Sequence, residues 1–353
     1  MSTAAELPST AGRAPHLASA LPAAGGLGVR ATAALLLAGG SLAGLGLVCV
    51  GFVLTDTPVP TGAVLFGRWI PALVSLGVIA LLCGPQRPRG MGDAVADAGG
   101  ANAGFRDPRA SAPPARPEPG GGRRFGAAGL GRELVRWWGL WPARRRPLLH
   151  IVGTSVLAML LLTGVYLLAA ALSQSLGAIR VQPAAALVPA LLMMVPVSVV
   201  FAMSTLGEEV VWRWHLPAVL SPLGFWGSAV LVAVAWTAFH IPLHWAYAAE
   251  GSVEPSTAVA LTAALPPLSL FLSALAARWA CVWPAVFAHA LPFTAVNLAA
   301  NGAELGPEAL WAVTGITAVL LVSAALVIAP VGGQEAGGPA RSQPGTTTPG
   351  PTR

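Results

Sequence analysis

The residues best suited to chemistry are two adjacent acids, Glu208 and Glu209, in a stretch apolar enough to lie in a lipid bilayer. No ionisable side chain occurs between residues 187 and 201, and the next acid or base after His215 is His240. A charged side chain at mid-membrane costs roughly 2.5–3.5 kcal/mol on insertion scales, so such residues usually mark a functional site. We therefore take this cluster as the centre of a candidate site.

Arg213 is the natural partner of the acid pair. On a helix, Glu209 and Arg213 lie four residues apart with the acid nearer the N-terminus, which favours an ion pair on one face. Glu208 is rotated by about 100° from Glu209, so one acid is expected to be held by arginine while the other faces a cavity as a general base. Alternatively, these charges mark a helix end at the membrane surface, where His215 is also expected, because hydropathy does not place them inside the span or just beyond it.

Two histidines interrupt later apolar segments, His240 and His289. A lone histidine in an apolar helix is usually a packing residue, but two of them with an acid pair could converge around one water. Such a cluster supplies a base and two donors or ligands, the minimum for hydrolysis inside a membrane. His244 has two-histidine metal spacing with His240. Because Pro242 between them is expected to break or kink the helix, His244 is only a supporting candidate.

The composition is that of a multi-pass membrane protein. Only 10% of residues are charged and the mean hydropathy is +0.70, against ~25% charged residues in soluble domains. All 20 basic residues are arginine, and with 41 Gly and 32 Pro this bias is typical of a GC-rich bacterial genome, so we expect a bacterial cell membrane. The pI near 10.5 does not indicate a nucleic-acid partner, because the arginines gather in a linker beside membrane segments and orient the protein there. Three cysteines in apolar segments lack zinc or disulfide spacing and are expected to be core residues: Cys49, Cys83 and Cys281.

We predict an all-α fold, a polytopic transmembrane helical bundle with about eight membrane spans. The predicted spans are Ala31–Leu54, Thr61–Cys83, Ile151–Leu172, a fourth from Leu187, Gly224–His240, Thr257–Ala277, Trp279–Ala299 and Ala309–Ala329. The predicted organisation is a disordered tail over 1–30, two transmembrane helices in 31–83, an Arg/Pro/Gly-rich linker over 84–148, a six-helix core in 149–330 and a disordered tail over 331–353. Arg68, in the second span, is expected to extend toward the membrane surface.

The linker predicts the orientation of the protein. By the positive-inside rule its arginines should be cytoplasmic, and eight spans would place both termini on that same side. Within the linker, Gly131–Trp141 is expected to form an interfacial helix, with its tryptophans at headgroup depth.

Three motifs together resemble those of the CPBP intramembrane proteases, a family that includes CAAX prenyl endopeptidases and bacteriocin-processing and immunity proteins. The first is Glu208-Glu209-x-x-x-Arg213. The second runs from Trp236 to His240 and continues Ile-Pro-Leu, and the third is Trp-Pro-Ala-Val-Phe-Ala-His289-Ala. The resemblance covers about residues 195–297, and its specificity lies in the order and spacing of the whole set.

The resemblance implies an intramembrane endopeptidase acting on membrane-associated peptides or proteins. Glu208 would activate the hydrolytic water, while Glu209 and Arg213 would brace the helix. His240 and His289 would bind and polarise the water or a metal, or stabilise the oxyanion. If a metal is used, zinc held by Glu208, His240 and His289 is expected, but a metal-free glutamate mechanism fits the same residues.

Two positions depart from the family pattern. Trp236 replaces the usual Phe and keeps an aromatic wall. The third motif usually reads His-x-x-x-Asn, whereas Phe293 stands four residues after His289. Asn297 lies a further turn on, roughly 80° around the helix from His289, and could contribute if Pro292 distorts the helix locally.

Two other functions fit the same residues. A catalytically inactive membrane scaffold or immunity protein would keep the ion pair for its structural role, with Phe293 blocking the site. A proton-coupled transporter would use Glu208, His240 and His289 as a proton relay, although the spans show no inverted repeat of the kind common in transporters.

Overall fold

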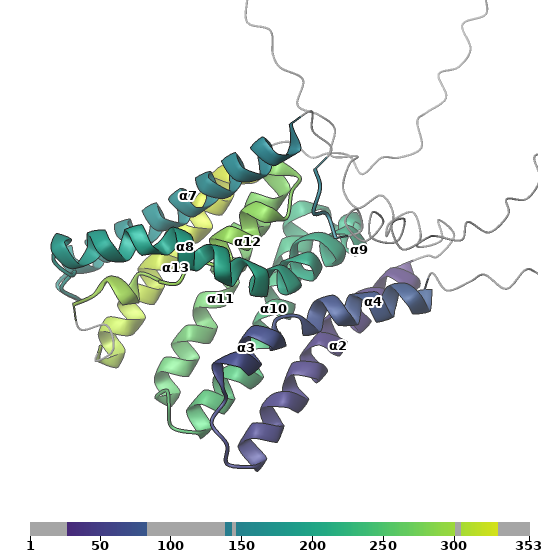
Figure 1. Cartoon of the computed structure of the whole chain (residues 1–353), viewed down its shortest axis with the longest axis horizontal. Coiled ribbons are helices and arrows are strands. Elements are labelled where there is room, and N and C mark those ends of the chain that lie inside the picture. The colour runs from purple at the N-terminus through teal and green to yellow at the C-terminus, as the bar shows by residue number, and fades with distance from the viewer. Residues whose placement is uncertain (1–26, 83–137, 143–145, 301–304, 331–353) are drawn as a thin grey trace, which may run out of the picture.

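The structure is a computed structural model that describes residues 27–82, 138–142, 146–300 and 305–330. Within these ranges the chain is helical apart from turns and an isolated bridge between Val181 and Ala299. In order, the elements are α2 (Leu27–Leu54), α3 (Thr61–Gly67), α4 (Ile70–Leu82), α7 (Pro147–Ser175), α8 (Ala184–Glu209), the π-helix η3 (Val210–His215), α9 (Leu216–Val219), η4 (Ser221–Leu223), α10 (Gly224–Ala249), α11 (Pro255–Trp279), α12 (Trp283–His289), η5 (Val296–Leu298) and α13 (Pro307–Ile328). Among the described residues, seven helices are long and apolar enough to cross a membrane. The predicted all-α transmembrane bundle is confirmed (Figure 1).

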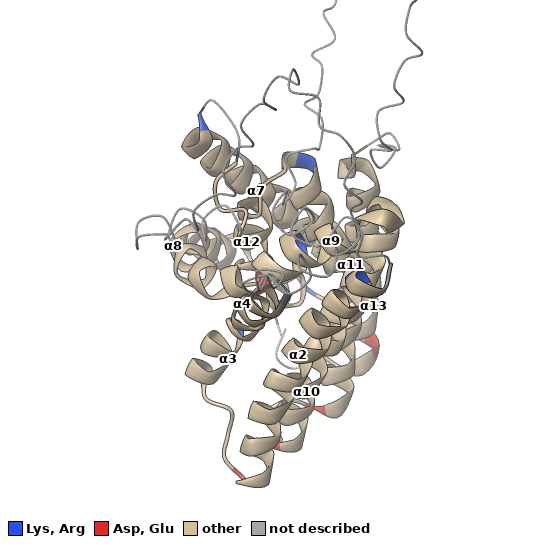
Figure 2. Cartoon of the chain, turned by 90° about the vertical axis from the view of Figure 1, so that its right-hand side faces the viewer, with Lys and Arg blue, Asp and Glu red and all other residues tan. Residues whose placement is uncertain are grey.

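The long helices are apolar on all sides, as membrane helices are. Leu192 and Val200, for example, are 72% and 71% exposed on a surface that a bilayer would cover. Figure 2 shows few acidic or basic positions along these helices. Several helices begin with proline in the first turn, including α7 and α11, where its missing N–H needs no intrahelical partner.

Some predicted span boundaries are wrong. The first helix begins at Leu27, so residues 27–30 of the predicted tail are helical. The fifth helix does not end at His240 but passes through Pro242 to Ala249, because neighbouring protein can satisfy the backbone groups that a proline frees in a membrane helix.

Most of the predicted linker, 84–148, lies outside the described residues, as does most of the predicted interfacial helix Gly131–Trp141. Its described end, residues 138–142, forms a turn and a bend. The core helix α7 then begins at Pro147, within the predicted linker. The predicted disordered tails, over 1–26 and 331–353, and Cys83 also lie outside the described residues, whereas Cys49 and Cys281 are buried as predicted.

The predicted seventh span, Trp279–Ala299, is wrong as a long helix. Helix α11 ends at Trp279, where Ala280 adopts a left-handed conformation with φ 48°. Helix α12 then covers only seven residues, ending at His289. Pro292 prevents continuation, because proline disfavours helical geometry at the preceding residue and lacks an N–H.

This segment nevertheless runs along α7 from one end to the other. Trp283 Nε1 donates to the carbonyl oxygen of Leu140 at 2.8 Å, shortly before α7 begins. Ala300 N donates to the carbonyl oxygen of Arg180 at 2.7 Å, shortly after α7 ends, and α12 packs against α7 in between. The predicted seventh span is therefore a short helix followed by irregular chain, a form that a membrane tolerates only where protein buries it or where it lines a cavity.

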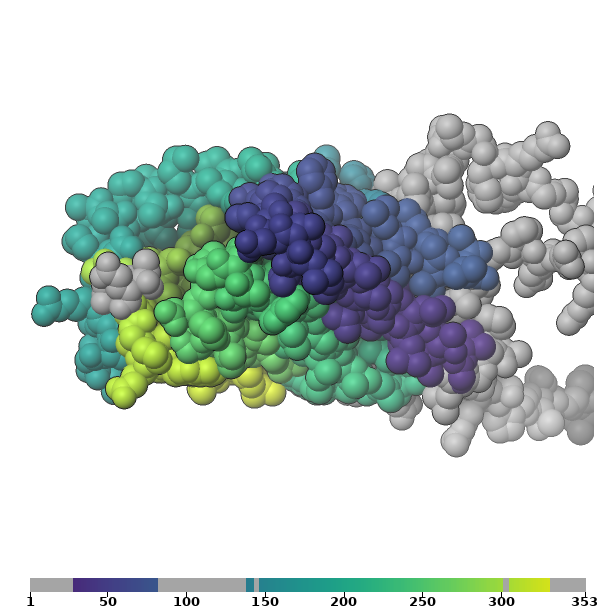
Figure 3. Space-filling model, turned by 90° about the horizontal axis from the view of Figure 1, so that it is seen from below, coloured from purple at the N-terminus to yellow at the C-terminus, as the bar shows by residue number. Residues whose placement is uncertain are grey.

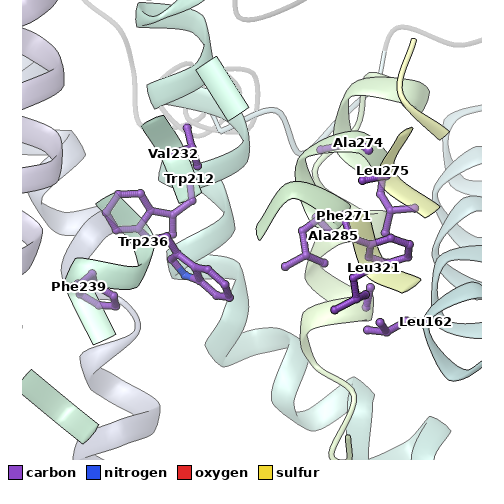
Figure 4. Packing of buried hydrophobic residues seen from close by; sticks show 14 of the residues in the cluster. Leu162, Trp212, Val232, Trp236, Phe239, Phe271, Ala274, Leu275, Ala285 and Leu321 are labelled. Carbon is purple, nitrogen blue, oxygen red and sulfur yellow. The ribbon is translucent and has the colours of Figure 1, made fainter. Parts of the chain in front are cut away.

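The buried apolar side chains form one large cluster and a smaller one contributed mainly by α8 and α12. Helix α2 packs against α4 and α10, while α11 packs between α10 and α13, and Figure 3 shows the purple and blue N-terminal helices lying against the green ones. Figure 4 shows residues of the large cluster, with Trp212, Val232, Trp236 and Phe239 on one side of the view and Leu162, Phe271, Leu275 and Leu321 on the other. Trp236 of this cluster also lies in the site described next.

Candidate active site

Neighbouring elements hold the last turn of α8 on both sides. Ser204 Oγ donates to the carbonyl oxygen of Leu65 in α3 at 3.0 Å. Thr205 Oγ1 donates to the carbonyl oxygen of Val286 in α12 at 3.1 Å. Glu208 and Glu209, which follow directly, are thus held in position relative to α3 and α12.

Gly207 allows the backbone between α3 and α4 to approach α8 closely. A Cβ at this position would lie 2.6 Å from the carbonyl oxygen of Arg68 and 2.8 Å from Trp69 Cα. These distances exclude any larger side chain unless the backbone moves. The α3–α4 junction therefore packs against α8 one residue before Glu208.

Glu208 and Glu209 lie inside a continuous helical run, not at its end. Helix α8 passes into the π-helix and then α9 without a break, giving a 36-residue run, Ala184–Val219. Both carboxylates are 0% exposed, so neither reaches water as a charged side chain extending from a helix end would. His215, expected at the interface, is also buried at 1% exposure. A π-helical turn of this kind is frequently found at functional sites.

Glu208 receives contacts from two other elements. Trp236 Nε1 donates to Oε2 at 2.7 Å, and Arg68 Nε lies 3.3 Å from Oε1. His240 Nε2 lies 3.7 Å from Oε2. The carboxylate is thus held by an indole N–H and a guanidinium and faces an imidazole.

The tautomer of His240 follows from its second nitrogen. Nδ1 lies 2.9 Å from the carbonyl oxygen of Trp236, and because a carbonyl only accepts, Nδ1 carries the proton. In the neutral ring, Nε2 then presents a lone pair toward Glu208. The 3.7 Å separation is too long for a direct hydrogen bond but is one that a bridging water can satisfy.

Glu209 forms a second, separate set of contacts. Arg213 Nε lies 3.0 Å from Oε2, which is the predicted ion pair. His289 Nδ1 lies 2.8 Å from Oε1. Arg213 Nη1 donates to Ser269 Oγ in α11 at 3.0 Å, and its guanidinium lies 5.0 Å from the ring centre of Trp236. Glu209 therefore joins α8, η3 and α12, and Arg213 adds α11.

The Trp236 ring lies between the two histidines. Its centre is 4.8 Å from that of His240 and 5.2 Å from that of His289. His289 is also within electrostatic range of Glu208 and His240. The structure thus brings together the acids and imidazoles that the sequence placed on three separate segments.

Three other predicted positions lie beside or outside this cluster. His244 is next to His240, with ring centres 6.1 Å apart, and its Nδ1 lies 2.7 Å from Thr262 Oγ1. Asn297 is exposed, and its Oδ1 accepts hydrogen bonds from the backbone N–H and hydroxyl of Thr294 at 2.8 and 3.1 Å. It is therefore not part of the buried cluster. Phe293 packs its ring edge-on against Tyr166 of α7, 5.8 Å away.

Sequence reasoning missed Arg68, Ser269 and the hydrogen bond from Trp236. Arg68 does not extend to the membrane surface as predicted but reaches Glu208, and its side chain is only 26% exposed. The signal was present, because a charged residue within an apolar span is a functional candidate by the same rule that identified the acids. Ser269 gave no signal, since serine is common in membrane helices.

The arrangement does not fit the zinc set considered from the sequence. In the described part of the chain, no group of three or more His, Cys, Asp or Glu side chains could hold a metal ion, whereas catalytic zinc takes three protein ligands. Both Glu208 oxygens already face donors, one of them the cationic Arg68. A guanidinium at this distance would repel a divalent cation bound to the same carboxylate.

The region that contains this site also matches a known protein family. A family model described as Type II CAAX prenyl endopeptidase Rce1-like matches residues 185–292. No curated protein and no solved structure is significantly similar to the chain. The region that holds the acid pair and both histidines thus matches the Rce1-like type II CAAX prenyl endopeptidase family, and the CPBP resemblance predicted from the three motifs is confirmed.

Proposed function

We propose that this protein is an intramembrane endopeptidase that hydrolyses membrane-associated peptides or proteins with a glutamate-activated water and without a metal. The observation that carries the proposal is a fully buried carboxylate, Glu208, facing His240 Nε2 across 3.7 Å within a membrane-spanning helix. The family match supports peptide-bond hydrolysis as the class of reaction.

In the proposed mechanism, one water lies between Glu208 and His240. It donates one hydrogen to the carboxylate and the other to His240 Nε2. Glu208 takes the proton as the water oxygen attacks the peptide carbonyl carbon, and then returns it to the leaving amine nitrogen. The proton is conserved, so Glu208 acts first as base and then as acid.

The surrounding contacts support this role. Trp236 and Arg68 fix the orientation of the Glu208 carboxylate, which reduces the reorganisation needed during reaction. Glu209 accepts the Nδ1 hydrogen of His289, so the Nε2 atom of that ring is the one available to substrate. Phe293 packs against Tyr166, which favours the enzyme over the inactive alternative in which this residue blocks the site.

Cleavage of a membrane-anchored peptide by the purified full chain in proteoliposomes tests the proposal. Glu208→Gln keeps the shape of the side chain but removes the base, and we expect a loss of about 10²–10⁴-fold in kcat, the usual contribution of a general base. The matched control is Glu254→Gln, at an exposed position preceding α11, which should cleave like the wild type. Wild-type cleavage by Glu208→Gln would refute Glu208 as the base and show that cleavage does not arise at this site, whereas no cleavage by the wild type would refute the enzyme assignment.

The metal-free part of the proposal has its own measurement. Cleavage should persist after treatment with 1,10-phenanthroline, and elemental analysis of the active protein should find no stoichiometric zinc. Loss of activity with the chelator, restored by added Zn²⁺, would show that a metal is required.

A further inference from the structure

Arg68 reaches the site because the second membrane segment is broken at that residue. Helix α3 ends at Gly67 and α4 begins at Ile70, so Arg68 and Trp69 form the turn between them. Pro71 explains the break, because it lacks an N–H and disfavours helical geometry at the residue before it. Broken helices within a membrane usually mark binding sites, since irregular backbone persists there only when it is buried or lines a cavity.

The position of this turn is fixed by α8. Gly207 packs directly against the backbone of Arg68 and Trp69, and Ser204 bonds to Leu65 one turn earlier. These contacts hold the base of the Arg68 side chain beside Glu208. The guanidinium therefore reaches the carboxylate from a turn whose backbone is held by packing against α8.

The guanidinium of Arg68 approaches Glu208 through Nε. Nε lies 3.3 Å from Oε1, and the hydrogen bonds among the described residues engage neither terminal nitrogen of Arg68. The side chain is also 26% exposed, in contrast to Arg213, which is buried and committed to Glu209 and Ser269. Arg68 thus keeps donors that an incoming group can use.

Hydrolysis at this site creates a need for such donors. When water adds to the scissile carbonyl, the C=O electron pair moves to oxygen, and the resulting oxyanion must be stabilised by nearby N–H groups. His240 carries its proton on Nδ1, bonded to the backbone, and His289 uses Nδ1 for Glu209. Asn297 is exposed and bonded to Thr294. Among these groups, Arg68 is the one with an uncommitted, permanently charged donor set.

We propose that the terminal nitrogens of Arg68 bind the oxyanion of the scissile carbonyl, which makes Arg68 a catalytic residue supplied from outside the matched region 185–292. The inference rests on the proposed endopeptidase function. No proton is transferred by Arg68: the water proton goes to Glu208 and then to the leaving amine, while the guanidinium only donates hydrogen bonds. The catalytic residues then come from α8, from α10 and from the turn between α3 and α4.

Substitution of Arg68 in the full chain, assayed in proteoliposomes, tests this role. Arg68→Gln should lower kcat by about 10²–10³-fold, the usual loss for one oxyanion donor, with KM within a few-fold of the wild type. Arg68→Lys keeps the positive charge but lacks the planar set of donors of arginine. Its kcat should lie between those of Arg68→Gln and the wild type. Arg278→Gln, at an exposed position in the last turn of α11, is the matched control and should behave like the wild type.

A transition-state mimic separates this role from a merely structural one. A phosphinic peptide carries a tetrahedral anion, so its affinity should fall with Arg68→Gln by the same factor as kcat/KM. Binding of uncleaved substrate, measured in the Glu208→Gln background, should not change. If Arg68 only holds Glu208 in place, affinity for the phosphinic peptide will be unaffected and the proposal is wrong.

The remaining outcomes are also decisive. An effect confined to KM, and only for substrates with a free C-terminal carboxylate, would assign Arg68 to that carboxylate and overturn the oxyanion role. If Arg68→Gln does not fold, wild-type kcat in a folded Arg68→Lys protein would equally refute it. Activity retained by Glu208→Gln would refute the proposed glutamate mechanism itself, whereas activity lost there but kept in Arg68→Gln refutes only the role of Arg68.

Discussion

The two neighbouring acids occupy different surroundings although they are one residue apart. Glu209 is enclosed by Arg213 and His289, so its charge is compensated inside the bundle. Glu208 is held by one indole N–H and one side of Arg68, and faces His240. The first set of contacts is suited to holding helices together and the second to receiving a proton from water.

The Glu209–Arg213 pair should be costly to break from one side. Arg213→Met would leave a fully buried carboxylate with His289 as its remaining hydrogen-bond partner, and removing one partner of a buried pair costs about 3–5 kcal/mol of unfolding free energy. Reversible unfolding in mixed micelles measures this loss. Arg278→Met, on an exposed arginine, should change stability by no more than about 0.5 kcal/mol.

The double variant Glu209→Gln/Arg213→Met tests whether the cost comes from the uncompensated charge. Because the buried anion is then absent, the double variant should recover part of the lost stability relative to Arg213→Met alone. A double variant whose losses simply add would mean that the two side chains do not interact energetically.

At the level of elements, the site is built where three irregular segments meet α10, the regular helix that carries Trp236 and His240. The α3–α4 turn supplies Arg68, the π-helix supplies Arg213, and the short α12 ends at His289. Each departure from a straight helix exposes backbone groups that a bilayer could not satisfy. The bundle brings these segments together around the end of α8, where Ser204 donates to the carbonyl oxygen of Leu65 and Thr205 to that of Val286, and the site lies beside these contacts.

Gly207 should be the position at which this meeting of elements is most sensitive. Gly207→Ala adds a Cβ 2.6 Å from the carbonyl oxygen of Arg68, so the α3–α4 turn must move away from α8. Overpacking of this kind costs about 1–3 kcal/mol, and cleavage should fall because Arg68 moves with the turn. Thermal unfolding and the proteoliposome cleavage assay measure the two effects.

A glycine in open surroundings provides the control. Gly153 lies on α7, and a Cβ there would meet nothing within 4 Å. Gly153→Ala should therefore retain cleavage and should not lower stability, since alanine favours a helix over glycine by up to about 1 kcal/mol. Equal effects of the two substitutions would show that close packing at Gly207 is not what positions the turn.

At the level of the whole molecule, the count of long helices and the count of crossings differ. Seven described helices are long enough to span, but residues 283–300 also run along α7 from its start to its end. Helix α7 has 29 residues and is about 43 Å long at 1.5 Å per residue. This exceeds the ~30 Å thickness of the hydrocarbon core, so a segment that follows the whole of α7 is long enough to cross. If residues 283–300 also cross, the chain makes eight crossings and both termini lie on one side of the membrane. This remains a prediction.

Reporter fusions can measure this topology. Fusions after residue 353 and within residues 84–137 should report the same, cytoplasmic side, while a fusion in the α10–α11 turn near Ser252 should report the opposite side. The α2–α3 turn, which lies at the lower edge of Figure 1, should agree with Ser252. A C-terminal reporter on the side opposite the linker would mean that residues 283–300 do not cross.

The sequence by itself determined the class of fold and the core of the site. Apolar runs of sufficient length require membrane helices because backbone groups in lipid must be satisfied within a segment, and most boundaries follow from that rule. Charge in such runs is expensive, which is why Glu208, Glu209 and Arg213 could be identified, and the i,i+4 spacing predicted the Glu209–Arg213 pair.

Only the tertiary structure decided which partners those residues have. Arg68 lies 140 positions before Glu208, and whether it points to the surface or inward depends on the break at Pro71 and the close approach at Gly207. Likewise, the left-handed Ala280 and Pro292 shorten the seventh segment, so Asn297 lies in an exposed turn and not one helical turn beyond the site. Local periodicity assumes a straight helix, and the positions of these residues depend on where packing makes the helices stop.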